Sequence, residues 1–123
     1  MARILIIDDD AGIRQSLRAL LERAGHDVAD ARDGGAGLRI HAAQRADLII
    51  TDLFMPDYDG IETIRELRRT DPTVKIIAMS GGGFDGTVDL NADAKSLGAQ
   101  HSLRKPLDGR ELLEAVREVL GQG

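Results

Sequence analysis

The sequence has no cysteine and very few aromatic residues: one tyrosine, two phenylalanines and no tryptophan in 123 residues. Without cysteine the chain can form no disulfide, no thiolate nucleophile and no thiolate metal site. Its 16 Lys and Arg are outnumbered by 21 Asp and Glu, for a net charge of −5, and the basic residues are scattered among the acidic ones. A nucleic-acid surface needs clustered basic residues, so the composition argues against a direct nucleic-acid partner.

Long hydrophobic runs are also absent. The longest uncharged apolar runs, such as residues 48–50 and 76–79, fall far short of the ~20 residues that a membrane span needs. The amino terminus enters a strand-like run directly, which predicts no signal peptide, a cytoplasmic location and no membrane association. The length suits one domain with a single core.

Apolar runs typical of buried strands alternate with stretches of helical periodicity. Residues 4–7 form a continuous β-branched run stopped by three aspartates, as expected of a strand buried on both faces. Asp10 is the predicted cap of the following helix, and Gly25 lies where that helix should end. Further strands are predicted at 27–31, 47–51, 74–79 and 99–103, and further helices at 34–43, 61–70, 88–97 and 108–120.

Five strands alternating with five helices indicate an α/β fold, a flavodoxin-like (βα)5 doubly wound sandwich. Its parallel sheet would have the order 2-1-3-4-5, with helices on both faces. Ligands of such sheets bind beyond the carboxyl ends of the strands, where the strand order reverses, here between the first and third strands. Asp8 and Asp9 directly follow the first strand, and Asp52 ends the third. The fold therefore predicts that these carboxylates share one crevice.

A crevice with three carboxylates favours a hard divalent cation, because oxygen ligands relieve their mutual repulsion by binding one. Mg²⁺ fits this description, and Mn²⁺ is an alternative. The fourth and fifth strands bring a hydroxyl, Ser80, and an ammonium group, Lys105, to the same edge, where both can hold phosphoryl oxygens. An aspartate is already ionised at neutral pH and needs no general base to act as a nucleophile. The pattern thus points to phosphoryl chemistry.

The chain resembles the receiver domain of bacterial response regulators, the CheY-like domain of two-component signalling. The resemblance is carried by the acid pair after the first strand, residues 51–60 around Asp52, the triplet Met79-Ser80-Gly81, and Lys105-Pro106. It implies a single receiver domain over residues 1–123, a stand-alone regulator with no output domain. Such a domain is a phosphoacceptor switch rather than an enzyme.

The resemblance also implies a task for each site residue. Asp52 would be the phosphoacceptor, taking its phosphoryl group from a sensor histidine kinase or a histidine phosphotransfer protein. Asp9 would be the carboxylate most directly on Mg²⁺, with Asp8 as its partner in the next shell, and Asp52 and the backbone carbonyl of Phe54 as further ligands. The Lys-Pro bond is often cis in this family.

Ser80 and Lys105 would hold phosphoryl oxygens, and the movement of Ser80 would switch the surface that binds an unknown downstream protein. The chain departs from the family pattern at Ser102, where an aromatic residue is usual. Neither Phe54 nor Gly82, each two positions after a site residue, offers a polar side chain to orient an attacking water. We therefore expect slow autodephosphorylation.

One alternative belongs to another functional class. An apolar strand followed by the D-x-D pattern of Asp8 and Asp10 is also typical of haloacid-dehalogenase-like phosphatases, in which Asp8 would be the nucleophile and Asp10 the general acid. That interpretation lacks a cap domain and leaves Asp52 unexplained. The glycine pattern at 81–86 matches a dinucleotide-binding loop, but no acid ends the following strand to hold a ribose.

Overall fold

The computed structural model describes residues 2–53, 55, 60–80 and 98–121. Its strands are β1 (Arg3–Ile7), β2 (Asp27–Ala31), β3 (Leu48–Asp52), β4 (Lys75–Ser80) and β5 (His101–Arg104). Its helices are α1 (Ala11–Arg23), α2 (Gly34–Ala43), α3 (Gly60–Thr70) and α5 (Gly109–Val119). The strands pair in parallel in the order β2-β1-β3-β4-β5, which confirms the predicted fold class. The helix predicted at 88–97 lies outside the described residues.

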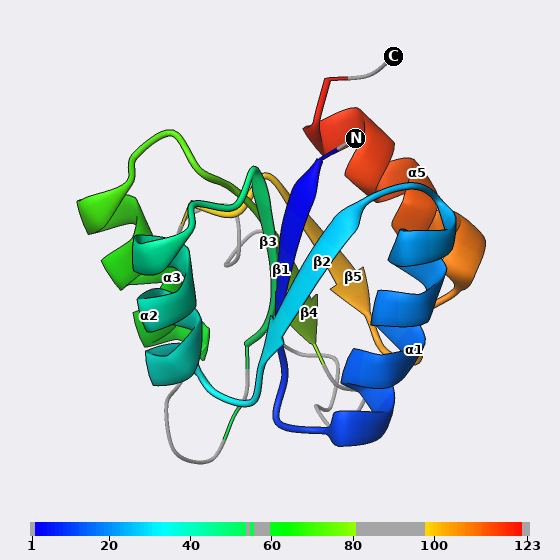
Figure 1. Ribbon diagram of the computed structural model, residues 1–123, viewed down its shortest axis with the longest axis horizontal. Helices are drawn as coiled ribbons and strands as arrows, with labels where there is room; N and C mark the ends of the chain where they lie inside the picture. The colour runs from blue at the N-terminus through cyan, green and yellow to red at the C-terminus, as the bar shows by residue number, and fades with distance from the viewer. Residues whose placement is uncertain (1, 54, 56–59, 81–97, 122–123) are drawn as a thin grey trace, which may run out of the picture.

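The sheet is covered on both faces, with α1 and α5 on one side and α2 and α3 on the other (Figure 1). Successive residues of a strand point to opposite faces, so Ile4 and Ile6 of β1 pack under α1 and α5, while Leu5 and Ile7 pack under α2 and α3. All four side chains are essentially fully buried. This two-sided burial explains why β1 is a continuous apolar run rather than an alternating one.

Short polar side chains set the helix ends. Asp10 accepts a hydrogen bond from the backbone N–H of Ile13 (3.2 Å) at the start of α1. After the last residue of that helix, Gly25 adopts a φ of 97°, a left-handed conformation that glycine takes without strain. Asp108 caps α5 by accepting from the N–H of Arg110 (2.9 Å). The predicted caps at Asp10 and Gly25 are confirmed.

The last strand begins later than predicted. β5 starts at His101 rather than residue 99, and a side chain takes over the pairing before it. Oε1 of Gln100 accepts a hydrogen bond from the N–H of Ile76 (2.8 Å), and the N–H of Gln100 donates to the carbonyl of Ile76 (2.9 Å). Arg68 on α3 also donates to Gln100 Oε1 (2.9 Å). The side-chain oxygen of Gln100 thus accepts a hydrogen bond that a backbone carbonyl would accept in a continuous strand. Strand propensities do not predict this replacement.

A polar network joins α2 to Asp71, which directly follows α3. It lies at the edge of the sheet where the strands begin. His41 is buried, and its Nδ1 accepts from the N–H of Ala46 (3.0 Å) while its Nε2 lies 2.9 Å from Asp71 Oδ2. The ring proton therefore lies on Nε2 and is donated to Asp71. Arg45 also donates to Asp71, from Nε at 2.8 Å. The Arg45 hydrogen bond is the main reason that the pKa of Asp71 lies well below its ordinary value.

In the part of the chain that the structure describes, no helix is long and apolar enough to cross a membrane.

The start of α3 lies directly against the end of β3. A Cβ built on Gly60 would stand 1.9 Å from the carbonyl oxygen of Asp52 and 2.6 Å from the Cα of Leu53. The N–H of Gly60 donates to the carbonyl of Leu53 (3.1 Å). Only glycine allows the helix to approach this closely, so Gly60 fixes where α3 begins relative to Asp52.

Gly60→Ala should lower the free energy of unfolding by about 2–4 kcal/mol, because the contacted atoms are backbone and cannot rotate away. The matched control is Gly35→Ala in α2, where a Cβ would meet its nearest atoms at ordinary distances of 3.5 and 3.6 Å. We expect the control to be neutral or stabilised by up to about 1 kcal/mol. Urea unfolding followed by circular dichroism measures both, and equal stabilities for the two variants would contradict the close approach.

Candidate functional site

The sheet register brings three predicted site residues to one edge. Ile7 pairs with Thr51, so the residues that follow them, Asp8 and Asp52, leave neighbouring strands at the same level. A carboxylate oxygen from each of Asp8, Asp9 and Asp52 lies within 4.8 Å of those of the other two. These residues follow or end the strands whose carboxyl ends point to the bottom of Figure 1. The structure therefore confirms that the acidic cluster assembles as the fold argument predicts.

The three carboxylates differ in their exposure. Asp8 is completely buried and Asp52 is 4% exposed, whereas Asp9 is exposed to solvent. Oδ1 of Asp8 accepts a hydrogen bond from the N–H of Asp10 (2.9 Å). Asp9 is thus the carboxylate that faces solvent beside a buried pair.

Lys105 bridges the two buried carboxylates. Its Nζ lies 2.8 Å from Asp8 Oδ2 and 3.1 Å from Asp52 Oδ2, and its side chain is 17% exposed. Burial acts to lower the pKa of Lys105, but the hydrogen bonds to Asp8 and then Asp52 outweigh it, and the pKa is raised above the ordinary lysine value. The ammonium group is therefore charged at neutral pH and holds the two carboxylates together.

The end of β4 is hydrogen-bonded to the backbone of Lys105. Ser80 is the last residue of β4 and is buried, and its carbonyl accepts from the N–H of Lys105 (2.8 Å). The peptide bond between Lys105 and Pro106 is cis, as the resemblance implies. Ser102 on β5 is half-buried and pairs with Ala78, on the face opposite Leu103. The predicted hydroxyl and ammonium groups thus come from adjacent strand ends.

The donor set fits a divalent cation. One ammonium group bonds to two of the three carboxylates, so the cluster keeps an excess of negative charge, and carboxylate oxygens are the ligands that Mg²⁺ prefers. Asp9 is open to solvent, which suits an ion that retains several waters. The predicted carbonyl ligand at Phe54 lies outside the described residues.

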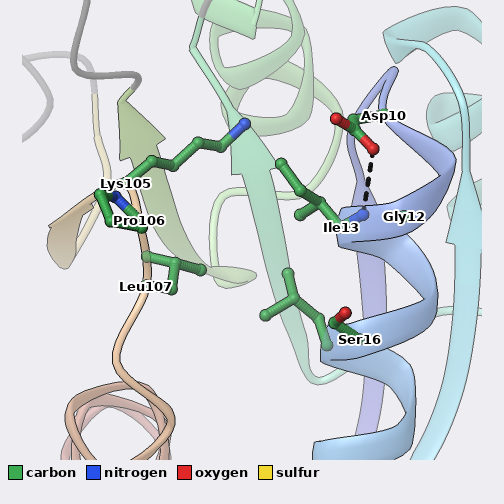
Figure 2. Close-up of a pocket in the computed structure, with 8 residues that line it drawn as sticks. Asp10, Gly12, Ile13, Ser16, Lys105, Pro106 and Leu107 are labelled. Carbon is green, nitrogen blue, oxygen red and sulfur yellow. Dashed lines mark hydrogen bonds between the residues drawn. The ribbon is translucent and has the colours of Figure 1, made fainter.

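A cavity of about 420 Å³ adjoins the site between α1 and the chain after β5. Figure 2 shows the Lys105 side chain extending from this chain toward the sheet edge, while the Asp10 carboxylate bonds to the first turn of α1. The remaining wall is largely apolar and includes Ile13, Leu17 and Leu107. The site therefore has an open apolar surface beside its charged edge.

A family model described as the response regulator receiver domain matches residues 4–117. The chain belongs to the response regulator receiver domain family. It is 40% identical over its full length to the transcriptional regulatory protein AfsQ1 of Streptomyces coelicolor, and it covers 53% of that protein. It is 33% identical to sporulation initiation phosphotransferase F of Bacillus subtilis, over 96% of this chain and 93% of that protein.

Solved structures agree with the family assignment. A receiver domain protein from Clostridium thermocellum superposes with a TM-score of 0.88 at 33% identity, over 99% of this chain and 96% of that one. The chemotaxis protein CheY4 of Vibrio cholerae gives a TM-score of 0.86 at 30% identity, over 97% and 98% of the two chains. Membership of this receiver family places the chain in two-component phosphorelay signalling.

The relatives also bear on the partner predictions. The chain spans about half the length of several curated relatives, among them AfsQ1 and the MprA response regulators. Because AfsQ1 is named as a transcriptional regulator, the expectation that this chain has no nucleic-acid partner finds no support in its relatives and stays a prediction. The stand-alone organisation likewise stays a prediction.

The phosphatase alternative is not favoured by the receiver fold. Asp8, its nucleophile, is fully buried with both carboxylate oxygens engaged, and Asp10, its general acid, caps α1. The sequence did not predict the contacts that two residues make at the site, Gly60 and Arg14. Gly60 contacts the backbone of Asp52, and Nη1 of Arg14 donates to the carbonyl of Asp8 at 2.8 Å. For Gly60, its place directly before the helix predicted at 61–70 was the one available signal, and in the structure it is the first residue of α3.

Lys105→Met should lower the free energy of unfolding by about 1–3 kcal/mol in a chelator-containing buffer at neutral pH, because two buried carboxylates then lose their counter-charge. The raised pKa of Lys105 means that its contribution is complete below the ordinary value of 10.5 and is lost as the pH rises past the higher folded value. The difference between wild type and variant should therefore hold steady from neutral pH to about 10.5, shrink between there and the higher folded value, and be lost above it.

Urea unfolding across the pH range measures this difference. Lys75→Met, at the start of β4 and away from the carboxylates, is the control and should show no such alkaline loss. A Lys105→Met protein as stable as wild type at neutral pH would show that the bridge contributes nothing.

Proposed function

We propose that this receiver domain accepts a phosphoryl group on Asp52 and changes its surface to bind a downstream protein. The observation that carries the proposal is the Lys105 ammonium group, 3.1 Å from Asp52 Oδ2 at the solvent-facing edge of the sheet. An ionised carboxylate held beside a fixed positive charge is a nucleophile for phosphorus that needs no base, and the charge is in place to neutralise a transferred phosphoryl oxygen.

The proposed transfer needs only a phosphohistidine donor and a proton from solvent water. A carboxylate oxygen of Asp52 attacks the phosphorus of a phosphohistidine, the P–N bond breaks, and its electron pair returns to the imidazole, which takes up a proton. The donor is the phosphohistidine of a sensor histidine kinase or a histidine phosphotransfer protein. The half-buried side chains of Ile13 and Leu107 offer apolar contact area for such a protein beside Lys105.

Mg²⁺, when bound, would supply further positive charge for the phosphoryl oxygens. Asp8, Asp9 and Asp52 would hold it, together with the carbonyl of Phe54. The solvent exposure of Asp9 supports its assignment as the most direct ligand, and the engagement of both Asp8 oxygens supports an indirect contact for that residue. Ser80 and Lys105 would then hold the phosphoryl oxygens.

The switch would run through the adjoining strand ends. The carbonyl of Ser80 accepts from the N–H of Lys105, so a movement of Ser80 toward the phosphoryl group is passed to the chain after β5. With Ser102 where an aromatic side chain is usual, this backbone link, rather than the rotation of a ring, would carry the change to the outer surface.

Acetyl phosphate with Mg²⁺ should label wild type with one phosphoryl group and release acetate, and Asp52→Asn should lose that label completely. Asp8→Asn should be labelled more slowly because the cation site is weakened. Asp33→Asn, which removes a carboxylate at the cap of α2 outside the acidic cluster, is the control and should match wild type. Intact-protein and peptide mass spectrometry locate the label. Persistent label in Asp52→Asn would overturn the proposal.

Purified phosphoprotein should lose its phosphoryl group slowly. The side chains at Phe54 and Gly82 offer no polar atom to orient an attacking water, so Phe54→Asn should shorten the lifetime several-fold and leave Asp52 as the labelled residue. Loss of label after removal of acetyl phosphate, followed by mass spectrometry, gives both rates. A wild-type lifetime of only seconds would contradict this prediction.

A further inference from the structure

Arg14 holds the backbone of the acidic cluster without belonging to it. Its Nη1 donates a 2.8 Å hydrogen bond to the carbonyl oxygen of Asp8, and its side chain is 19% exposed. No part of the proposed phosphoryl chemistry uses this residue. Its position one turn into α1 links the helix to the end of β1.

The contact with Asp8 bears on Asp9. The carbonyl of Asp8 and the N–H of Asp9 belong to one planar peptide group. A guanidinium that fixes the oxygen therefore fixes this plane, and with it the Cα from which the Asp9 side chain leaves. Asp9 is the exposed member of the cluster, whereas Asp8 is held by the residues packed around it. The position of the Asp9 carboxylate therefore depends more strongly on its backbone.

Arg14 is itself held in place by β2. Its Nε lies 3.5 Å from Asp30 Oδ1, and Nη1 of Arg18, one helical turn later, lies 2.8 Å from Asp30 Oδ2. Asp30 pairs with Ile6 in the sheet, so its carboxylate is anchored to a rigid element. The two arginines thus share one carboxylate, but only Arg14 also has a hydrogen bond to Asp8.

We propose that Arg14, anchored by Asp30, is a positioning residue that fixes the Asp8–Asp9 peptide and thereby preorganises the acidic cluster for a divalent cation. The inference rests on the proposed function for the identity of the cation site. Groups that orient metal ligands from outside the coordination shell typically change metal affinity by 10–100-fold when removed. The effect here belongs at the low end, because a single backbone contact is involved.

The test measures Mn²⁺ binding to the unphosphorylated protein by the electron paramagnetic resonance signal of free Mn²⁺. Arg14→Met should weaken Mn²⁺ binding about tenfold. Arg14→Lys keeps the charge but cannot reach Asp8 and Asp30 together, and it should fall between Arg14→Met and wild type. Arg18→Met removes the other ion pair with Asp30 and should stay within about twofold of wild type.

A second readout separates positioning from general destabilisation. In acetyl phosphate labelling, Arg14→Met should raise the half-saturating Mg²⁺ concentration and keep the wild-type rate at saturating Mg²⁺. If Arg14→Met does not fold, Asp30→Asn replaces it, with an expected loss of about threefold in Mn²⁺ affinity.

The outcomes distinguish this inference from the function beneath it. If Asp52 is labelled but Arg14→Met or its replacement binds Mn²⁺ as wild type does, the positioning proposal is overturned and the proposed function stands. If Arg14→Met weakens Mn²⁺ binding while wild type is not labelled at Asp52, the positioning proposal holds and the phosphoacceptor assignment fails. An equal loss in Arg14→Met and Arg18→Met would also overturn the positioning proposal.

Discussion

The contact on which the rest of this molecule depends is the ammonium group of Lys105 between two buried carboxylates. Asp8 and Asp52 end up side by side because β1 and β3 are neighbours in register, and two like charges in a buried place destabilise the fold unless something neutralises them. Lys105 neutralises them although it follows β5, an outer strand of the sheet that is separated from β3 by β4. The strand order, the burial of the two acids and the placement of the lysine therefore depend on one another.

The fold was predictable because its three central strands, β1, β3 and β4, are buried on both faces. Runs such as residues 4–7 have no polar alternation to confuse with a helix, and the aspartates that stop them mark the strand ends. From there the strand order alone places Asp8, Asp9 and Asp52 together, before any family resemblance is considered. The caps at Asp10 and Gly25 were also predictable, because both depend on local backbone chemistry rather than on distant parts of the chain.

The features that could not be predicted from the sequence depend on how helices and strands pack against one another. Asp8 and Asp9 are adjacent and chemically identical, yet one is fully buried against Lys105 and the other is exposed, a difference that residue type alone does not give. The close approach of Gly60 to Asp52 reflects how α3 is placed on the sheet. Likewise the side-chain amide of Gln100 stands in for a strand acceptor, and no propensity scale describes such a substitution.

The network of His41, Asp71 and Arg45 is a second polar cluster, separate from the acidic site. It lies at the edge where the strands begin, and its polar groups are paired: the imidazole bonds on both nitrogens, and the Asp71 carboxylate accepts from His41 Nε2 and from two nitrogens of Arg45. The other edge carries crowded acids that work against folding. The sheet thus has a paired polar network at one edge and a cluster with excess negative charge at the other, so stability supplied at the first edge offsets the cost of crowding acids at the second.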